Sequence, residues 1–211
     1  METNIYKPPE SNVAQAEPMS PEFYVVSRNK FLILFISTLG LYRLYWFYKN
    51  WSLYRKSSGK KMWPVMRAFF SIFFAHALFK LFDAKSKEID QTYQWSPGNM
   101  ATLYVLFAIL ENVSDRLSRK SIGEPFTDLI ILITLPVIGW TLYKAQISAN
   151  IACHDAAGAG NNRLSPANYA WIVLGVIFWV LVGLGLYEIT VGLPEWKGLL
   201  DEPAWHWPDK E

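Results

Sequence analysis

Long apolar runs, separated by short polar segments, dominate the chain between positions 30 and 190. A helix that crosses a bilayer needs about 20 mostly apolar residues, because its backbone amides must all be satisfied within the segment. Five runs approach this length, and they predict an all-α, polytopic transmembrane helical bundle. The predicted spans are residues 30–48, 64–82, 99–116, 126–144 and 168–190.

The third run is the weakest of the five, because polar residues crowd its last turns. These residues are Glu111, Asn112, Ser114 and Asp115. An interfacial or re-entrant helix is the alternative for this run, and the bundle would then have four spans. In either case residues 30–192 form the predicted transmembrane domain.

The two ends of the chain are predicted to lie outside this domain. Residues 1–29 are rich in proline and glutamate and have no apolar stretch near the start, which is typical of a flexible tail and not of a cleaved signal peptide. The first apolar run is then an uncleaved anchor. Residues 193–211 are predicted to form a polar C-terminal tail.

Basic residues in the short loops predict the orientation, because cytoplasmic loops are enriched in lysine and arginine. Residues 49–61 hold the densest basic cluster and are predicted to face the cytoplasm. With five spans, residues 116–124 and the C-terminal tail share that side. Residues 83–98 and the N-terminal tail then face the opposite side.

Aromatic residues next to the basic cluster indicate a helix end at the lipid headgroups. The residues predicted for this lipid interface are Tyr45, Trp46, Tyr48, Lys49, Trp51, Arg55, Lys56, Lys60 and Lys61. A more specific hypothesis is that the segment recognises one kind of lipid headgroup. Both interpretations make membrane lipids partners of the chain.

Composition supports a membrane protein. Of 211 residues, 52% are hydrophobic and only 18% are charged, below the roughly 25% of charged residues in soluble domains. The net charge of +2 and the lack of a recognition motif argue against nucleic acid as a partner.

Two parts of the chain share an order of features that suggests a duplication of one helical hairpin. Each has an apolar span, Thr-Leu, Tyr-Lys, a polar stretch, a glycine, a proline and a second apolar span. Thr-Leu is at 38–39 and 134–135, and Tyr-Lys is at 48–49 and 143–144. Few residues are identical, so similar patterning without duplication is an equal alternative.

The stretch "TLGLYRLYWFYKNW", residues 38–51, resembles the TLG-x-Y-x2-YW-x-YK signature of a family of small bacterial membrane proteins classed as a domain of unknown function. The similarity covers about residues 22–82 and weakens in the second half, where "TLPVIGWTLYKAQ" lacks the paired Tyr-Trp. The resemblance implies a location in the bacterial inner membrane. It implies no activity.

Ionisable residues inside membrane spans are costly and are therefore candidates for function. The candidates are Arg43, Arg67, His76 and Glu111. Arg43 and Glu111 are each about 18 Å from the outer end of their predicted spans at 1.5 Å per residue, so the two side chains can meet. One interpretation is an ion pair that fixes helix packing, and the other is a polar path for protons or solutes.

Catalytic patterns are missing from the sequence, so we expect no enzyme activity. Cys153, His154 and Asp155 are the residue types of a nucleophile, a base and an orienting acid, but neighbours on a helix point in different directions. Zinc-binding and nucleotide-binding spacings are absent, so no metal and no cofactor are expected.

The sequence therefore predicts a structural or accessory inner-membrane protein, which binds lipid, another membrane protein or a second copy of itself. The alternative is a small transporter or channel. A transporter should have a water-accessible cavity that reaches the charges at mid-depth, whereas an accessory protein should have paired charges and a free apolar flank.

Overall fold

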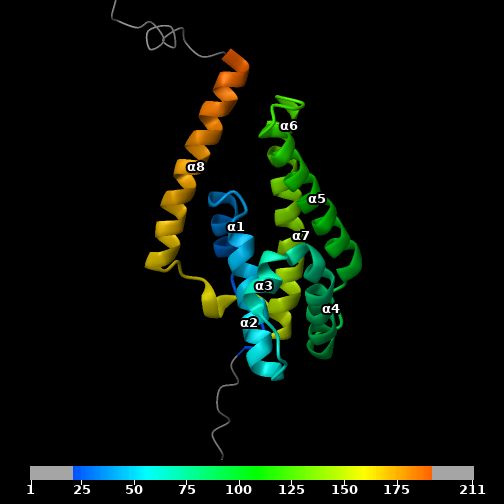
Figure 1. Cartoon of the computed structure of the whole chain (residues 1–211). Helices are drawn as coiled ribbons and strands as arrows, with labels where there is room; N and C mark the ends of the chain where they lie inside the picture. Colours follow the sequence, from blue (N-terminus) through cyan, green and yellow to red (C-terminus); the bar gives the residue numbers. More distant parts are fainter. Residues whose placement is uncertain (1–20, 192–211) are drawn as a thin grey trace, which may run out of the picture.

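The computed structural model describes residues 21–191, and all regular structure in that range is helical (Figure 1). The elements are α1 (Arg28–Ser37), α2 (Tyr42–Ser58), α3 (Pro64–Phe69), α4 (Ser71–Ile89), α5 (Pro97–Ser118), α6 (Phe126–Leu129), α7 (Ile131–Ala152), the short 3-10 helix η1 (Ala159–Asn161) and α8 (Pro166–Val191). The predicted all-α class is confirmed for this range. The predicted C-terminal tail, residues 193–211, lies outside the described residues.

Helices α4, α5 and α7 pack on one another and build the core together with α2. Large aromatic side chains fill it. The ring of Trp46 on α2 lies edge-on to Phe82 on α4, with 5.8 Å between the ring centroids. Both residues are completely buried, and so is Phe79. Because aromatic side chains bury more apolar area than most others, this cluster is a main source of the fold's stability.

The first predicted span, residues 30–48, is not a single helix. The chain turns back after α1 through Leu39 and Gly40, whose φ angles are 49° and 79°. The Thr38 hydroxyl then accepts a hydrogen bond from the Tyr42 N–H at 3.0 Å, at the start of α2. The ten residues of α1 extend only about 15 Å, half of a bilayer's apolar thickness. Helices α1 and α2 therefore form a hairpin (Figure 1).

The other predicted spans correspond to helices with shifted bounds. Residues 64–82 are divided at Phe70 between α3 and α4, and α4 continues to Ile89. Residues 99–116 lie within the uninterrupted α5. The fourth span begins in α6, and α7 extends beyond it to Ala152, whereas the fifth span matches α8 closely.

The last part of the predicted N-terminal tail is packed into the protein. Phe23 and Val26 have no exposed surface. The Tyr24 N–H donates to Asn50 Oδ1 at 3.0 Å, and the side chain of Asn150 bonds both backbone groups of Val26. A flexible tail is therefore wrong for this part of residues 1–29, because its apolar side chains fill the space between α2 and α7.

The ends of α2 and α4 lie together at one end of the molecule. The Phe23 ring stacks on Tyr54 of α2, with 5.9 Å between centroids, and meets Phe82 of α4 edge-on at 4.8 Å. Residues 49–61 and 83–98 therefore adjoin the N-terminal segment. The α1–α2 hairpin returns to the end from which it starts, so the structure does not support their predicted separation on opposite faces of a membrane.

Two helical stretches in the described range are long and apolar enough to cross a membrane. They are Phe126–Ala152 and Pro166–Glu188. Only 6% of the apolar window in the second stretch is buried, compared with 28% in the first. Many large apolar side chains of α8 are exposed, as they are in a helix that contacts lipid. The other three predicted spans do not meet this test.

Helix α8 is attached to the rest of the protein through α1 alone among the described helices. The indole N–H of Trp179 donates to the Ile36 carbonyl at 2.8 Å. Gly175 lies so close to α1 that a Cβ atom there would be 1.8 Å from the Ser37 carbonyl oxygen.

The two hairpins with a similar order of sequence features do not pack alike. Helix α2 packs against α3, whereas α7 and α8 have no close approach. The structure therefore gives no support to a repeated hairpin. The shared order of Thr-Leu, Tyr-Lys, glycine and proline places similar residues on helices with different neighbours.

Candidate functional site

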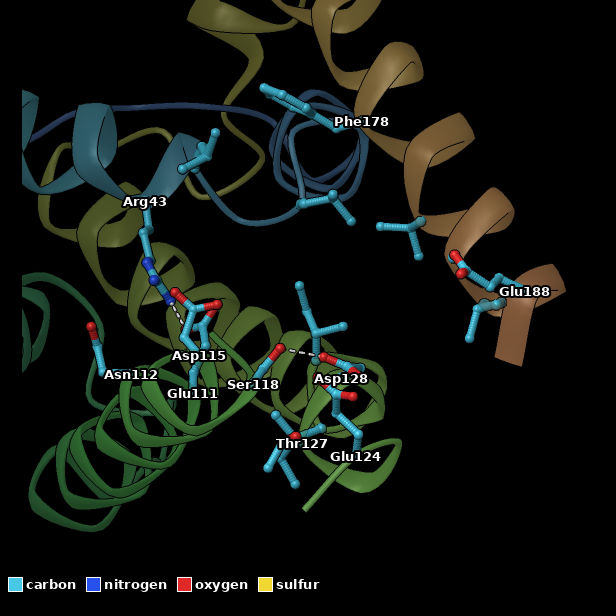
Figure 2. Close-up of a pocket in the computed structure, with 17 residues that line it drawn as sticks. Arg43, Glu111, Asn112, Asp115, Ser118, Glu124, Thr127, Asp128, Phe178 and Glu188 are labelled. Atoms are coloured by element: carbon cyan, nitrogen blue, oxygen red, sulfur yellow. Dashed lines mark hydrogen bonds and ion pairs between the residues drawn. The ribbon is translucent and has the colours of Figure 1, made fainter. Parts of the chain in front are cut away.

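A cleft of about 860 Å³ lies between the second half of α8 and the neighbouring ends of α5, α6 and α7 (Figure 2). The α1–α2 turn forms its inner end. Its polar lining consists of Arg43, Glu111, Asn112, Asp115, Ser118, Glu124, Thr127, Asp128 and Glu188. Its apolar lining consists of Leu39, Leu41, Ile130, Ile131, Phe178, Val182, Gly185 and Leu186. We refer to this space as the acidic cleft.

An ion pair stands at the inner end of the acidic cleft. Arg43 lies in the first turn of α2, and its Nη1 atom is 2.5 Å from Glu111 Oε2 on α5 (Figure 2). The two side chains are 20% and 18% exposed. The meeting of these residues, expected from their depth, is thus present. The pair joins the α1–α2 hairpin to α5. Both of its side chains also line the acidic cleft, so a molecule in the cleft can contact them.

The remaining charges of the cleft are all negative. Asp115 pairs with Arg119 at 2.6 Å, but both side chains are more than 60% exposed, and such pairs contribute little to stability. Asp128 accepts a hydrogen bond from the Ser118 hydroxyl. Within residues 21–191, Glu124 and Glu188 have no hydrogen-bond or ion-pair partner.

One guanidinium therefore faces five carboxylates in the acidic cleft. Low-dielectric walls on both sides strengthen the field of such a cluster, because a lined cleft concentrates one sign of potential. The arrangement attracts cations and repels anionic groups. It is chemically suited to hold an ammonium or guanidinium group.

The outer wall of the cleft is a strip of α8. Phe178, Val182 and Leu186 are spaced by four residues, which places them on one face of the helix. A Cβ atom added at Gly183 or Gly185 would meet nothing within 4 Å. This half of α8 therefore stands away from the other described helices, and the cleft has an apolar border.

Arg67 and His76 lie elsewhere in the fold. The Arg67 guanidinium is 4.4 Å from the centre of the Trp51 ring and 4.9 Å from that of Phe74. His76 on α4 shares a 3.0 Å hydrogen bond with the Thr102 hydroxyl on α5. Neither residue lines the acidic cleft, so a single path through all four predicted ionisable residues is not present.

Two of the residues predicted for the lipid interface are in the core instead. Trp46 and Trp51 have no exposed surface. The Trp46 indole donates to the side-chain oxygen of Gln146 on α7, which draws the ring inward. Tyr45 and Tyr48 are 44% and 39% exposed, as an interfacial position requires.

The basic residues of the same segment lie along the end of α2 and the connection that follows it. Lys49 is half-buried, and its ammonium lies 5.8 Å from the centre of the Tyr45 ring. The exposed members are Arg55, Lys56, Lys60 and Lys61. Residues 49–58 thus belong to a helix and not to a loop.

Sequence reasoning missed most of the acidic cleft, although the chain contained a signal for it. Asp115, Asp128 and Glu188 each lie near the end of a predicted span, and the predicted order of spans places these three ends on one side. Three carboxylates on one side of a small bundle indicate an acidic surface. Their approach to Arg43 depends on the α1–α2 turn, which the apolar pattern does not reveal.

Cys153, His154 and Asp155 do not form a catalytic group. Cys153 Sγ lies against the Phe23 backbone, and the Asp155 carboxylate accepts the N–H groups of Ala159 and Gly160 at 2.8 Å each. Burial raises the pKa of the Cys153 thiol, which opposes a role as a nucleophile. Among residues 21–191, no three His, Cys, Asp or Glu side chains are grouped to hold a metal ion.

No protein-family model matches the sequence, and neither the curated proteins nor the solved structures contain a match. The resemblance to the family with the TLG-x-Y-x2-YW-x-YK signature stays a prediction. The function must therefore be argued from the acidic cleft and from the surfaces around it.

Proposed function

We propose that this chain is an accessory protein of the bacterial inner membrane, which binds a helix of another membrane protein in its acidic cleft. The observation that carries the proposal is the construction of the cleft. One wall is a strip of α8, which among the described helices packs on α1, and the inner surface carries five carboxylates. Apolar borders suit a helix in lipid, and the acidic interior selects a basic side chain on that helix.

In the proposed arrangement, α5, α7 and α8 cross the membrane, and the α1–α2 hairpin enters it and returns. The end that holds residues 49–61 faces the cytoplasm, because it is the most basic part of the chain. Leu39 and Leu41 at the hairpin turn line the cleft beside Phe178, which lies near the middle of α8. The cleft then extends from mid-depth towards the opposite surface.

The partner's chemistry follows from the charges that lack a partner. A lysine or arginine within a membrane helix is costly unless an acidic group pairs with it. Glu124, just before α6, and Glu188, on α8, offer such groups near the open end of the cleft. One basic residue in the outer half of a partner helix can pair with both carboxylates.

Site-specific photo-crosslinking in native membranes tests this proposal. A photoreactive residue at Val182, on the cleft side of α8, should crosslink to another membrane protein. The same residue at Val180, which lies on the opposite face and is 55% exposed, should crosslink mainly to lipid. The crosslinked peptide should be apolar and carry a lysine or arginine, and the crosslink should disappear in the Glu124→Lys/Glu188→Lys variant. Equal crosslinks from both positions would exclude the cleft as the binding site.

A path for small cations is the second candidate, because the α1–α2 break lies beside the cleft. Transporters use interrupted helices at mid-depth to form substrate sites. Purified protein in liposomes should then carry a cation flux that the Glu111→Gln variant abolishes. The accessory role predicts no flux above that of empty liposomes.

A further inference from the structure

A second pocket, of about 580 Å³, lies between the N-terminus of α1 and the connection from α7 to α8. It is separate from the acidic cleft. Its lining consists of Ser27, Arg28, Asn29, Ala157, Ala159, Asn162 and Arg163. None of these side chains is acidic, and two are arginines with exposed side chains.

A buried cation lies next to this pocket. Lys30 is only 6% exposed, and its ammonium donates to Asn161 Oδ1 and to the Arg163 carbonyl, both at 2.7 Å. Both acceptors are neutral, and within the described chain no carboxylate lies within 4 Å of the ammonium. A buried charge without a counter-charge is unfavourable, so an anion beside this ammonium would stabilise it.

The N-terminus of α1 adds to the positive potential. The Ser27 side chain caps the helix by accepting the Lys30 N–H at 3.4 Å. The N–H groups of Arg28 and Asn29 belong to the first turn, where no backbone carbonyl of the helix is available to them. Such amides and the helix dipole together favour a bound anion.

The pocket is held in shape by the segment before α1. Asn161 Nδ2 donates to the Val25 carbonyl at 2.8 Å. Gly158 has a φ of 68°, and a Cβ atom there would lie 2.4 Å from the Val26 carbonyl oxygen. The nearby Asp155 carboxylate is already engaged by two backbone N–H groups. Arg28 and Arg163 are therefore presented on a fixed backbone, which lowers the entropic cost of binding.

We propose that this pocket binds a phosphate group, with Arg28 and Arg163 as its ligands and Lys30 as the supporting charge. Guanidinium groups suit phosphate because they donate two parallel hydrogen bonds. The phosphate belongs to an anionic lipid headgroup or to free phosphate. The lipid source fits the position of the pocket, in the connection between the two helices that are apolar enough to cross a membrane. This proposal does not depend on what the acidic cleft holds.

Native mass spectrometry of the full chain in detergent, titrated with phosphatidylglycerol, tests the proposal. The Arg28→Gln/Arg163→Gln variant should bind the first lipid at least tenfold more weakly than the unchanged protein. The Arg116→Gln/Lys120→Gln variant is the matched control, because it removes two exposed cations at the end of α5, away from this pocket, and its affinity should change less than twofold. Equal losses in the two variants would overturn the proposal.

Two further probes separate the sources of phosphate and guard against misfolding. If the lipid headgroup is the ligand, inorganic phosphate at millimolar concentration should leave the lipid bound. If free phosphate is the ligand, the same concentration should displace the lipid. In the unchanged protein, phosphatidylglycerol or inorganic phosphate should protect Arg28 and Arg163, but not the exposed Arg116, from an arginine-modifying reagent. If Arg28 and Arg163 react equally fast with and without these two ligands, the proposed site is excluded, and this result does not depend on a variant.

Discussion

Arg43 and Trp46 lie one helical turn apart, yet sequence reasoning succeeded for one and failed for the other. The position of Arg43 along an apolar run predicted a need for a buried acid, and Glu111 was the acid at matching depth. Trp46 stands beside a basic cluster, where interfacial and core tryptophans have the same sequence context. Its burial depends on Gln146, far along the chain, which accepts the indole N–H.

The ion pair gives a prediction about coupling between two residues. Arg43→Ala and Glu111→Ala should each lower the free energy of unfolding by about 1–3 kcal/mol, less than the roughly 3–5 kcal/mol for fully buried pairs, because both side chains are partly exposed. The double variant should lose less than the sum, since removing one partner leaves the other charge uncompensated. Melting temperatures in detergent measure these differences.

The exposed pair Asp115–Arg119 is the control for this cycle. Both of its side chains are more than 60% exposed. Asp115→Ala, Arg119→Ala and their combination should stay within about 0.5 kcal/mol of the unchanged protein. Strict additivity at Arg43 and Glu111, as at the control pair, would mean that the buried pair does not fix the hairpin to α5.

Cys153 gives a prediction about thiol chemistry. Burial raises the pKa of its thiol, so at pH 8 the folded protein holds less thiolate than an exposed cysteine does. Since the thiolate is the reactive form, alkylation should be slower than for the unfolded chain, and the reaction should accelerate as the pH rises towards the raised pKa. Phe23→Ala, which removes the buried ring that packs the segment onto Tyr54 and Phe82 and so loosens the backbone beside the sulfur, should accelerate alkylation at constant pH. Equal rates for folded and unfolded protein would contradict the packed N-terminal segment.

At the scale of elements, uninterrupted apolar runs were predicted well and broken ones were not. Helices α5 and α8 cover residues 99–116 and 168–190 without interruption, although of the two only α8 is long and apolar enough to cross a membrane. The break between α1 and α2 depends on positive φ angles at Leu39 and Gly40, which hydropathy cannot register. The glycine in "TLG" was the local signal, and the flanking residues are apolar even though Ile36 and Leu41 are 50% and 44% exposed.

Gly175 gives a prediction about how α8 is held. Gly175→Ala should lower stability by about 1–3 kcal/mol, because the new methyl group would overlap the end of α1. Gly183→Ala is the matched control on the same helix, and it should be neutral or stabilise by up to about 1 kcal/mol, since alanine favours a helix and the site is open. Melting temperatures of the two variants should therefore shift in different directions. A similar shift in both would show that α8 does not rest on α1.

At the scale of the whole molecule, one hairpin changes the end of the protein at which the later segments lie. The sequence pattern counts residues 30–48 as one crossing. Each following loop is then assigned to the side opposite the loop before it, so an error at this first segment passes to all later assignments. In the structure α1 and α2 fold back on each other, so the N-terminal segment lies beside the ends of α2 and α4. Hydropathy does not distinguish one continuous span from a short helix followed by a second helix that turns back.

Labelling of single cysteines in intact cells tests this arrangement. In a Cys153→Ser background, Ser57→Cys and Ser96→Cys should both resist an impermeant thiol reagent applied from outside, because both residues lie at the basic end that we propose to be cytoplasmic. Ser121→Cys, in the exposed turn between α5 and α6, should react. Lysis should make all three equally reactive, since each of these serines is exposed. Opposite responses of Ser57→Cys and Ser96→Cys in intact cells would restore a crossing at residues 64–82 and would exclude the hairpin topology, together with the mid-depth position of Arg43 that depends on it.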